Sequence, residues 1–317
     1  MAHPPPHRPR PRPPRTPEPV DIRRPFRTRD AAASGVSKRR LYSPEFRRIV
    51  RSVHILATVR PQSWHEAEAV ILVAGDGAFV SDHTAARLFG AVVPDEEHLH
   101  ASIEPTRHRS TIPGVIVHRS THVPQRFRGL PVTSPVDTFL DLSACLGLVD
   151  LVAVGDSLVH RGRTTPEALV RAAEEEGRGR RAREAARLVR AGVESPMETR
   201  LRLLIVLAGL PEPEVNIKIR DERGDVVRRI DLGYSDQKVG IEYDGKQHAT
   251  SRHQYAADVR RREELAALGW RLWVAVSDDL FTSPGAALAR IVAVMRERGM
   301  GVPHLRDAWR AHFRGRE

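Results

Sequence analysis

Apolar and polar positions recur along the chain with two different periods, and together these periods predict a mixed α/β protein. Apolar residues spaced three and four apart predict helices through much of the middle of the chain. These segments are 65–75, 81–91, 134–147, 149–162 and 165–192, the last of which divides into two helices. Alternation in HLHASI (98–103) and GVIVHRS (114–120) predicts strands.

Histidines are frequent in this middle region but do not follow a ligand spacing. They are His83, His98, His100, His118 and His122. None of them forms a pattern such as HExxH, in which two histidines one helical turn apart bind zinc. We therefore assign them to the surface and to polar contacts in the core.

The C-terminal third has a definite order of elements. Ser195, Pro196 and Glu198 form a capping box at the start of an apolar helix that ends at Gly209. The expected strands are EVNIKIR (214–220), DVVRRIDLGY (225–234) and KVGIEYDG (238–245), and later elements lie in 252–269, 270–276 and 283–299. The predicted order is helix, three strands, helix, strand, helix.

The second and third of these strands are expected to form a hairpin. With a turn over residues 235–238, Tyr234 faces Val239. Counting outward from the turn, Asp231 then lies opposite Glu242 on the same face of the sheet.

Further charged groups continue this acidic face. Asp244 is two residues after Glu242, and Lys246 joins them if the strand persists past Gly245. Carboxylate oxygens suit Mg²⁺ or Mn²⁺, so Asp231, Glu242 and Asp244 are the candidate metal ligands. Glu198 is accounted for by capping but remains a candidate for the outer shell. The alternative is a charged hairpin edge that opposes aggregation.

The N-terminal segment has a basic helix-turn-helix outline. A short alanine-rich helix is expected over residues 28–34, followed by a glycine turn and a second helix capped by Ser37. That helix opens with Lys38, Arg39 and Arg40, which are candidate DNA contacts because the early residues of a recognition helix meet the DNA. The RRIVRSVHI segment then predicts a wing strand.

Length and charge restrict the class of protein. The 317 residues predict two or three domains, and the net charge of +11 suits phosphate attraction. Arginine-rich composition also follows from a GC-rich genome, since only four of the 51 basic residues are lysines. Residues 1–25 are rich in proline and arginine and are expected to be a disordered tail.

Cysteine content and the absence of long apolar runs predict the cellular compartment. The single cysteine, Cys145, excludes an internal disulfide and indicates no oxidising compartment. The sequence has no apolar run approaching ~20 residues and no signal-peptide pattern at its start. We expect a cytoplasmic protein with no membrane partner.

Several C-terminal motifs occur together between residues 194 and 300. They are ESPMETRLR, GLPEPEVN, IDLGY, VGIEYDGKQH and the D-x-R-R…LGWR stretch from Asp258 to Arg271. Jointly they resemble the PD-(D/E)xK nuclease superfamily, most closely its very-short-patch-repair-like endonuclease branch. The resemblance implies a restriction-endonuclease-like αβββαβ core. It also implies that Asp231 and Glu242 are the first and second metal-binding acids, with the Tyr243 carbonyl as a further ligand.

The motif lysine departs from the family pattern. Two residues after Glu242 stands Asp244, whereas Lys246 stands two residues after Asp244, and His248 is a second candidate for the same role. The candidate catalytic residues are therefore Asp231, Glu242, Asp244, Lys246 and His248. The choice of base and stabiliser between Lys246 and His248 stays open.

The N-terminal part resembles the winged-helix region of the AbiEi-type antitoxins. RTRDAAASGVSKRRLY, SDHTAARLFGA and LPVTSPVDTFLDL carry this similarity over about residues 26–145. It implies binding to DNA and a cognate toxin protein as a partner. It transfers no catalytic residue.

These inferences divide the chain and define two functions. The expected parts are a tail (1–25), a winged helix (26–60), an antitoxin-like α/β middle region (61–194), an endonuclease-like domain (195–300) and a C-terminal tail (301–317). The first function is a magnesium-dependent DNA endonuclease or nickase, with Arg261 and Arg262 as further DNA contacts. The alternative is a non-catalytic DNA-binding antitoxin or transcriptional repressor of a toxin–antitoxin or phage-defence system.

Overall fold

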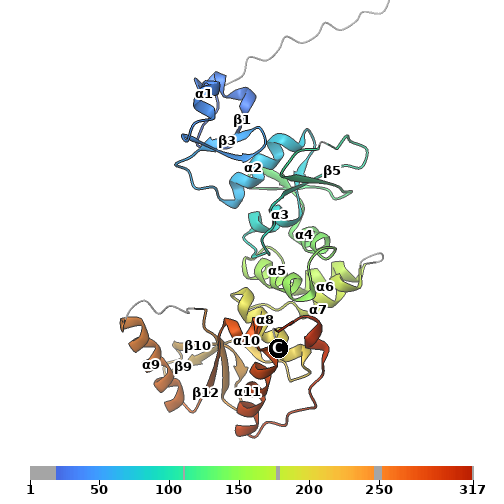
Figure 1. The fold of residues 1–317 in the computed structure, drawn as a ribbon. Coiled ribbons are helices and arrows are strands. Elements are labelled where there is room, and N and C mark those ends of the chain that lie inside the picture. The colour runs from blue at the N-terminus through green and yellow to red at the C-terminus, as the bar shows by residue number, and fades with distance from the viewer. Residues whose placement is uncertain (1–18, 110, 176–178, 246–251, 316–317) are drawn as a thin grey trace, which may run out of the picture.

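The computed structural model describes residues 19–109, 111–175, 179–245 and 252–315, with only the backbone described over 252–258. Within these residues the chain forms three β-sheets and 11 α-helices, so the expected mixed α/β class is confirmed. Figure 1 shows the N-terminal sheet near the top and the C-terminal sheet near the bottom, with helices of the middle region between them. No helix in the described part of the chain combines the length and the apolar character needed to cross a membrane.

The N-terminal sheet is small and three-stranded, in the order β1-β3-β2. Its elements are β1 (Phe26–Arg27), β2 (Phe46–Val50) and β3 (Val53–Leu56), with α1 (Lys38–Leu41) before the β2–β3 hairpin. Ser37 caps α1 as predicted, because its hydroxyl accepts a hydrogen bond from the Arg40 N–H at 3.3 Å. Phe26, Leu41 and Phe46 form much of a small apolar cluster here, while Val50 and Val53 at the β2–β3 hairpin belong to the main cluster of the molecule.

The short helix expected over residues 28–34 is divided into two turns and is not α-helical. Two 3₁₀ turns, η1 (Thr28–Asp30) and η2 (Ala32–Ser34), occupy this segment, and Gly35 ends it in the left-handed region at φ 69°. So short a segment does not offset the cost of nucleating an α-helix, and 3₁₀ turns are the usual outcome. Because α1 is also only four residues long, the described elements lack two full helices of a helix-turn-helix.

The middle region is built on a five-stranded sheet in the order β6-β5-β4-β8-β7. Its strands are β4 (Phe79–Val80), β5 (Leu99–Ile103), β6 (Val115–Arg119), β7 (Gln125–Phe127) and β8 (Leu130–Val132). Its helices are α2 (Ser63–Ala74), α3 (Asp82–Phe89), α4 (Pro135–Leu142), α5 (Leu148–His160), α6 (Pro166–Glu174) and α7 (Arg180–Leu188). The expected helices and both expected strands are present. The other three strands span two or three residues, which is too short to show a period.

The middle region and the C-terminal part are joined through packed helices. Helix α8 (Pro196–Leu207) begins at the predicted Ser195 cap and packs against α5. Between them, Arg202 is completely buried and donates to Asp156 at 3.1 Å. One continuous apolar cluster includes residues on both sides of the expected boundary at 194–195.

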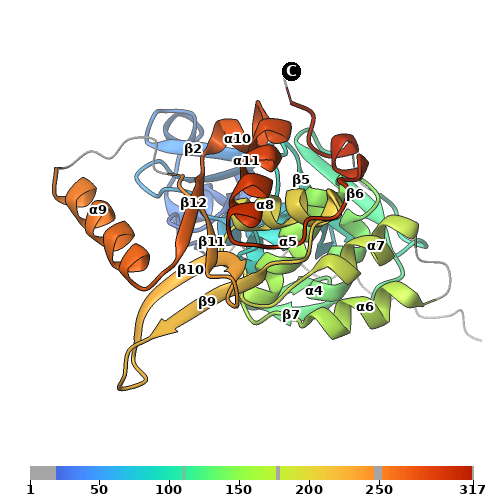
Figure 2. The same cartoon turned by 90° about the horizontal axis from the view of Figure 1, so that it is seen from below.

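The C-terminal sheet is four-stranded, in the order β12-β11-β10-β9. Its strands are β9 (Glu214–Arg220), β10 (Val226–Tyr234), β11 (Val239–Tyr243) and β12 (Arg271–Ala275). The helices that follow β11 are α9 (Arg252–Ala267), α10 (Ser277–Phe281) and α11 (Pro284–Glu297). Figure 2 shows α9 on one side of the sheet and α8 and α11 on the other. The element order is the expected one, with α10 added.

The C-terminal part continues the hairpin register and the apolar packing to the end of the described chain. Tyr234 pairs with Val239, so the predicted hairpin register is confirmed. The region assigned to a C-terminal tail contains η3 (Ala308–Ala311), which packs against α8. Trp309 and Phe313 from this region are buried in the main apolar cluster.

Candidate functional site

Two acidic side chains lie beside each other on neighbouring strands of the C-terminal sheet. Leu232 on β10 pairs with Ile241 on β11, so the next position away from the turn brings Asp231 beside Glu242. Both line a pocket of about 200 Å³. The remaining lining residues are Tyr243, Asp244, Gly245, Arg261, Arg262 and Val274. The structure therefore brings the three predicted ligand carboxylates to one pocket.

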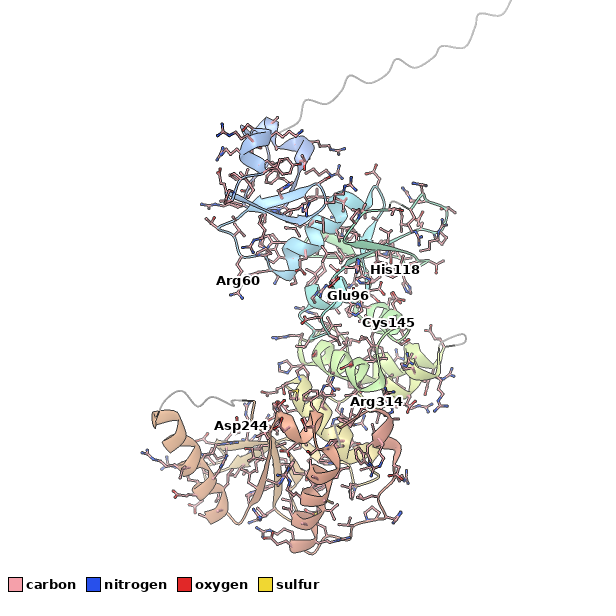
Figure 3. The ribbon with its side chains drawn as sticks, viewed as in Figure 1. Arg60, Glu96, His118, Cys145, Asp244 and Arg314 are labelled. Atoms are coloured by element: carbon pink, nitrogen blue, oxygen red, sulfur yellow. The ribbon has the colours of Figure 1, made fainter. Side chains whose placement is uncertain are left out.

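Asp244 stands where β11 leaves the sheet. Its backbone N–H donates to the Ala275 carbonyl at 2.8 Å, which extends the parallel pairing of β11 with β12. Figure 3 shows Asp244 on the side of the C-terminal sheet that faces the middle region. Among the described residues, the carboxylates of this pocket do not form a group of three with all ligand atoms within 4.8 Å. Their oxygens line the same pocket, but they do not converge closely enough to form a complete set of metal ligands.

Burial disfavours negative charge on the two central acids. Desolvation raises the pKa of Asp231, although the Tyr243 N–H donates to its Oδ2 at 3.1 Å. Desolvation likewise raises the pKa of Glu242, and the neighbouring Asp231 charge raises it further. Two such carboxylates become easier to ionise when a cation lies close to both.

Arg261, on α9, supplies a cation to this site. Its Nη1 donates to Glu242 Oε2 at 2.8 Å, and its Nη2 donates to Glu242 Oε1. The same Nη2 donates to the Arg229 carbonyl at 2.9 Å, which ties α9 to β10. Arg261 was predicted to contact DNA, and in this structure its guanidinium binds Glu242. Arg262 is exposed at the same pocket.

Only half of the predicted capping box forms, because the Glu198 carboxylate reaches one residue beyond the Ser195 cap. The Ser195 hydroxyl accepts from the Glu198 N–H at 3.2 Å, and the Glu198 carboxylate accepts from the Glu194 N–H at 2.9 Å. Burial raises the pKa of Glu198, and the nearby Asp231 charge acts in the same direction. The start of α8 therefore lies close enough to the pocket for Glu198 to influence it electrostatically.

The remaining predicted residues lie elsewhere. Lys246 and His248 fall outside the described residues. Lys38, Arg39 and Arg40 are exposed on α1, which Figure 1 shows far from the C-terminal sheet. Arg40 binds Glu45 through Nε at 2.7 Å.

Sequence reasoning missed a second cluster, in the middle region. Asp82, His100 and His118 each offer one ligand atom, and these atoms all lie within 4.8 Å of one another. His100 is on β5 and His118 on β6, two parallel neighbours in which His118 pairs with Ser102. The two imidazoles thus occupy the same face at adjacent strands. The alternating pattern predicted both strands, but not that they are neighbours.

The middle cluster is tightly packed. His100 Nδ1 lies 2.9 Å from His118 Nε2, which in turn lies 3.6 Å from Asp82 Oδ2. Burial lowers the pKa of His100 to about 4, so this imidazole is neutral at physiological pH. The group lines a cavity of about 600 Å³, and Figure 3 shows His118, Glu96 and Cys145 in this part of the molecule.

Comparison with known proteins finds two relatives whose names state no function. No protein-family model matches the sequence. The chain is 28% identical over 242 residues to the uncharacterized protein Rv2248 of Mycobacterium tuberculosis (strain ATCC 25618 / H37Rv). It has the same identity to the uncharacterized protein MT2308 of Mycobacterium tuberculosis (strain CDC 1551 / Oshkosh). Each match covers 75% of this chain and 88% of the relative. The function must therefore be argued from the sites themselves.

Proposed function

We propose that the protein is a metal-dependent DNA endonuclease or nickase that hydrolyses phosphodiester bonds in the cytoplasm. The observation that carries this proposal is the placement of Asp231 and Glu242 on adjacent strands of one pocket, with Asp244 at its edge. The proposed fold of this part is the restriction-endonuclease-like core. The helix, three strands, helix, strand order and the covering of both sheet faces by helices support that reading.

The donor set fits a hard divalent cation. All three candidate ligands are carboxylates, and Mg²⁺ and Mn²⁺ prefer oxygen. When bound, such a cation supplies an activated water and offsets negative charge at phosphorus. Asp231 and Glu242 would hold it, and Arg262 would attract the phosphate of the DNA backbone to the pocket.

Arg261 and a divalent cation compete for the same oxygens of Glu242. In this structure the guanidinium compensates the buried carboxylate, because an unpaired buried charge is costly. A cation at Glu242 would release the positive charge of Arg261 to contact phosphate. In this proposal Arg261 has two roles: it neutralises Glu242 before a cation binds, and it contacts DNA afterwards.

A plasmid-nicking assay tests the proposal. We expect the purified protein to nick supercoiled DNA with Mg²⁺ or Mn²⁺ and not with EDTA. Asp231→Asn and Glu242→Gln should each reduce nicking at least ~100-fold, the scale of losing one main electrostatic contributor to catalysis. Asp236→Asn is the matched control, because Asp236 is an exposed acid in the turn of the same hairpin. Undiminished nicking by Asp231→Asn would refute the assignment.

The second candidate is a DNA-binding antitoxin or repressor with no cleavage activity. The Arg261–Glu242 ion pair favours it, because it compensates the acid without any metal. This candidate predicts binding to the promoter of its own gene, a cognate toxin as partner, and no cleavage with any divalent cation. The nicking assay beside a promoter-binding assay therefore separates the two.

A further inference from the structure

We propose that the middle region holds a second metal site, in which Asp82, His100 and His118 bind one divalent transition-metal ion of the Zn²⁺ class. The site is separate from the carboxylate pocket, because its ligands come from α3, β5 and β6 rather than from the C-terminal sheet. The test of this site is therefore independent of the test of the proposed nuclease.

Geometry is the first argument for this site. His100 Nδ1 and His118 Nε2 lie 2.9 Å apart, which leaves room for one proton between the two nitrogens. At least one of these nitrogens is therefore unprotonated and presents a lone pair. Asp82 Oδ2 lies 3.6 Å from the same His118 nitrogen. Three atoms that can each donate a lone pair thus converge within 4.8 Å. A cation satisfies all three at once, whereas a shared proton satisfies two.

Orphaned polar atoms are the second argument. Among the described residues, His100 Nε2 and His83 Nδ1 are buried without a hydrogen-bond partner. Both side chains line the cavity beside the cluster, and both residues are more than nine-tenths buried. Buried imidazole nitrogens normally have a partner. His100 contributes Nδ1 to the cluster, so its Nε2 and the His83 nitrogen lie outside the three ligand atoms, and they indicate a further polar ligand or water in the cavity beside the metal position.

The backbone at Asp82 is the third argument. Asp82 is the first residue of α3 and has φ 49°, in the left-handed region that non-glycine residues seldom adopt. Such strain is retained where the surrounding structure over-determines it, and it concentrates at functional sites. Here it accompanies a carboxylate that is aimed at two histidines.

The donor set selects the class of metal. Two imidazoles and one carboxylate suit Zn²⁺ and related transition metals, whereas Mg²⁺ prefers oxygen ligands throughout. Three protein ligands beside a cavity of about 600 Å³ leave a coordination position for water or a small ligand. That arrangement is typical of an open zinc site rather than of a closed structural one.

Equilibrium dialysis of the full-length, untagged protein tests the site. The protein is stripped with EDTA, the chelator is removed, and Zn²⁺ or the spectroscopic probe Co²⁺ is added alone. We expect one tightly bound Zn²⁺ per chain that is retained by the Asp231→Asn/Glu242→Gln double variant. Bound Co²⁺ should give the intense visible absorption of low-coordinate cobalt.

Two ligand variants complete the test. His118→Ala and Asp82→Asn should each weaken Zn²⁺ binding by more than ~10-fold, the lower limit for losing even an outer-shell partner. Asparagine tolerates the left-handed backbone at position 82, and circular dichroism checks that both variants fold. His304→Ala, which removes an exposed histidine far along the chain, should bind as the wild type does. Failure of the wild type to bind Zn²⁺, or equal binding by folded His118→Ala and Asp82→Asn, would overturn the proposal.

Discussion

Arg261 and Glu242 form a paired contact at the carboxylate pocket. It has two guanidinium–carboxylate hydrogen bonds, and the carboxylate is buried whereas the guanidinium is partly exposed. A paired geometry of this kind is stronger than a simple ion pair. Access of a metal to Glu242 therefore depends on how easily Arg261 leaves it.

Replacing Arg261 should change metal binding at the carboxylate pocket. We expect Arg261→Ala to bind Mn²⁺ at least about tenfold more tightly than the wild type, because a hydrogen bond to a charged group that competes with the metal contributes about 1.5–3 kcal/mol. Isothermal titration measures this directly. Arg262→Ala is the control, since it removes a charge from the same pocket without breaking the pair with Glu242. Unchanged Mn²⁺ affinity in Arg261→Ala would show that the two cations do not compete.

Glu198 should give the stability a pH dependence. Burial raises its folded-state pKa above the ordinary value, so the folded protein holds the proton more tightly than the unfolded chain. Its contribution therefore favours folding at acidic pH and declines as the pH rises through the raised pKa. Glu198→Gln keeps an acceptor for the Glu194 N–H and removes this dependence. Thermal melts at about pH 4.5 and about pH 7.5 should show the variant gaining relative to the wild type at the higher pH. A constant difference between them would contradict this.

At the scale of elements, the interface between α5 and α8 determines how the C-terminal part is attached. Asp156 on α5 accepts hydrogen bonds from Arg202 at 3.1 Å, from Thr199 Oγ1 at 2.8 Å and from the Arg190 N–H at 2.7 Å. Three donors satisfy a carboxylate that is almost completely buried. A second pair, Asp150 with Arg200, joins the same helices at a partly exposed position.

Breaking the buried pair should strongly destabilise the protein. Asp156→Ala leaves the buried Arg202 with the partly exposed Glu212, at 3.1 Å, as its remaining carboxylate partner, so we expect a loss of about 3 kcal/mol in the free energy of unfolding, the lower end for breaking a buried pair. Asp150→Ala is the matched control between the same helices and should cost less than about 1 kcal/mol, as exposed pairs do. Urea unfolding followed by circular dichroism compares them. Equal costs would show that burial does not set the strength of this interface.

At the scale of the whole molecule, the two candidate sites and the basic α1 lie at different levels of an extended arrangement (Figure 1). The carboxylate pocket is in the C-terminal sheet, the histidine cluster is in the middle sheet, and α1 belongs to the N-terminal sheet. One apolar cluster is continuous from Val50 and Val53 of the N-terminal sheet through the middle region into the C-terminal part, and a smaller cluster around Phe26 lies beneath α1. DNA bound at α1 would therefore reach the carboxylate pocket only at a different place along the same duplex.

The exposed cations of α1 should contribute to DNA affinity through phosphate attraction. Lys38→Ala and Arg39→Ala should each weaken binding of a duplex by a similar factor for all sequences. Each should also reduce the slope of log K against log salt by about 1. Arg40→Ala should have a smaller effect, because Arg40 already binds Glu45. Fluorescence anisotropy across a salt series measures the slopes, and slopes unchanged by Lys38→Ala and Arg39→Ala would remove α1 from the DNA interface.

The sequence by itself determined the features that depend on neighbours along the chain. The caps at Ser37 and Ser195 and the pairing of Tyr234 with Val239 are set by local hydrogen bonds and by the length of one turn. The same turn length predicted that Asp231 and Glu242 share a face, which is why the carboxylate pocket could be anticipated.

Only the tertiary structure decided which distant segments meet. The parallel pairing of β5 with β6 brings His100 to His118, and the path of α9 brings Arg261 to Glu242. Neither contact has a local signature, because residue periodicity states which face a side chain occupies and not which strand or helix covers it.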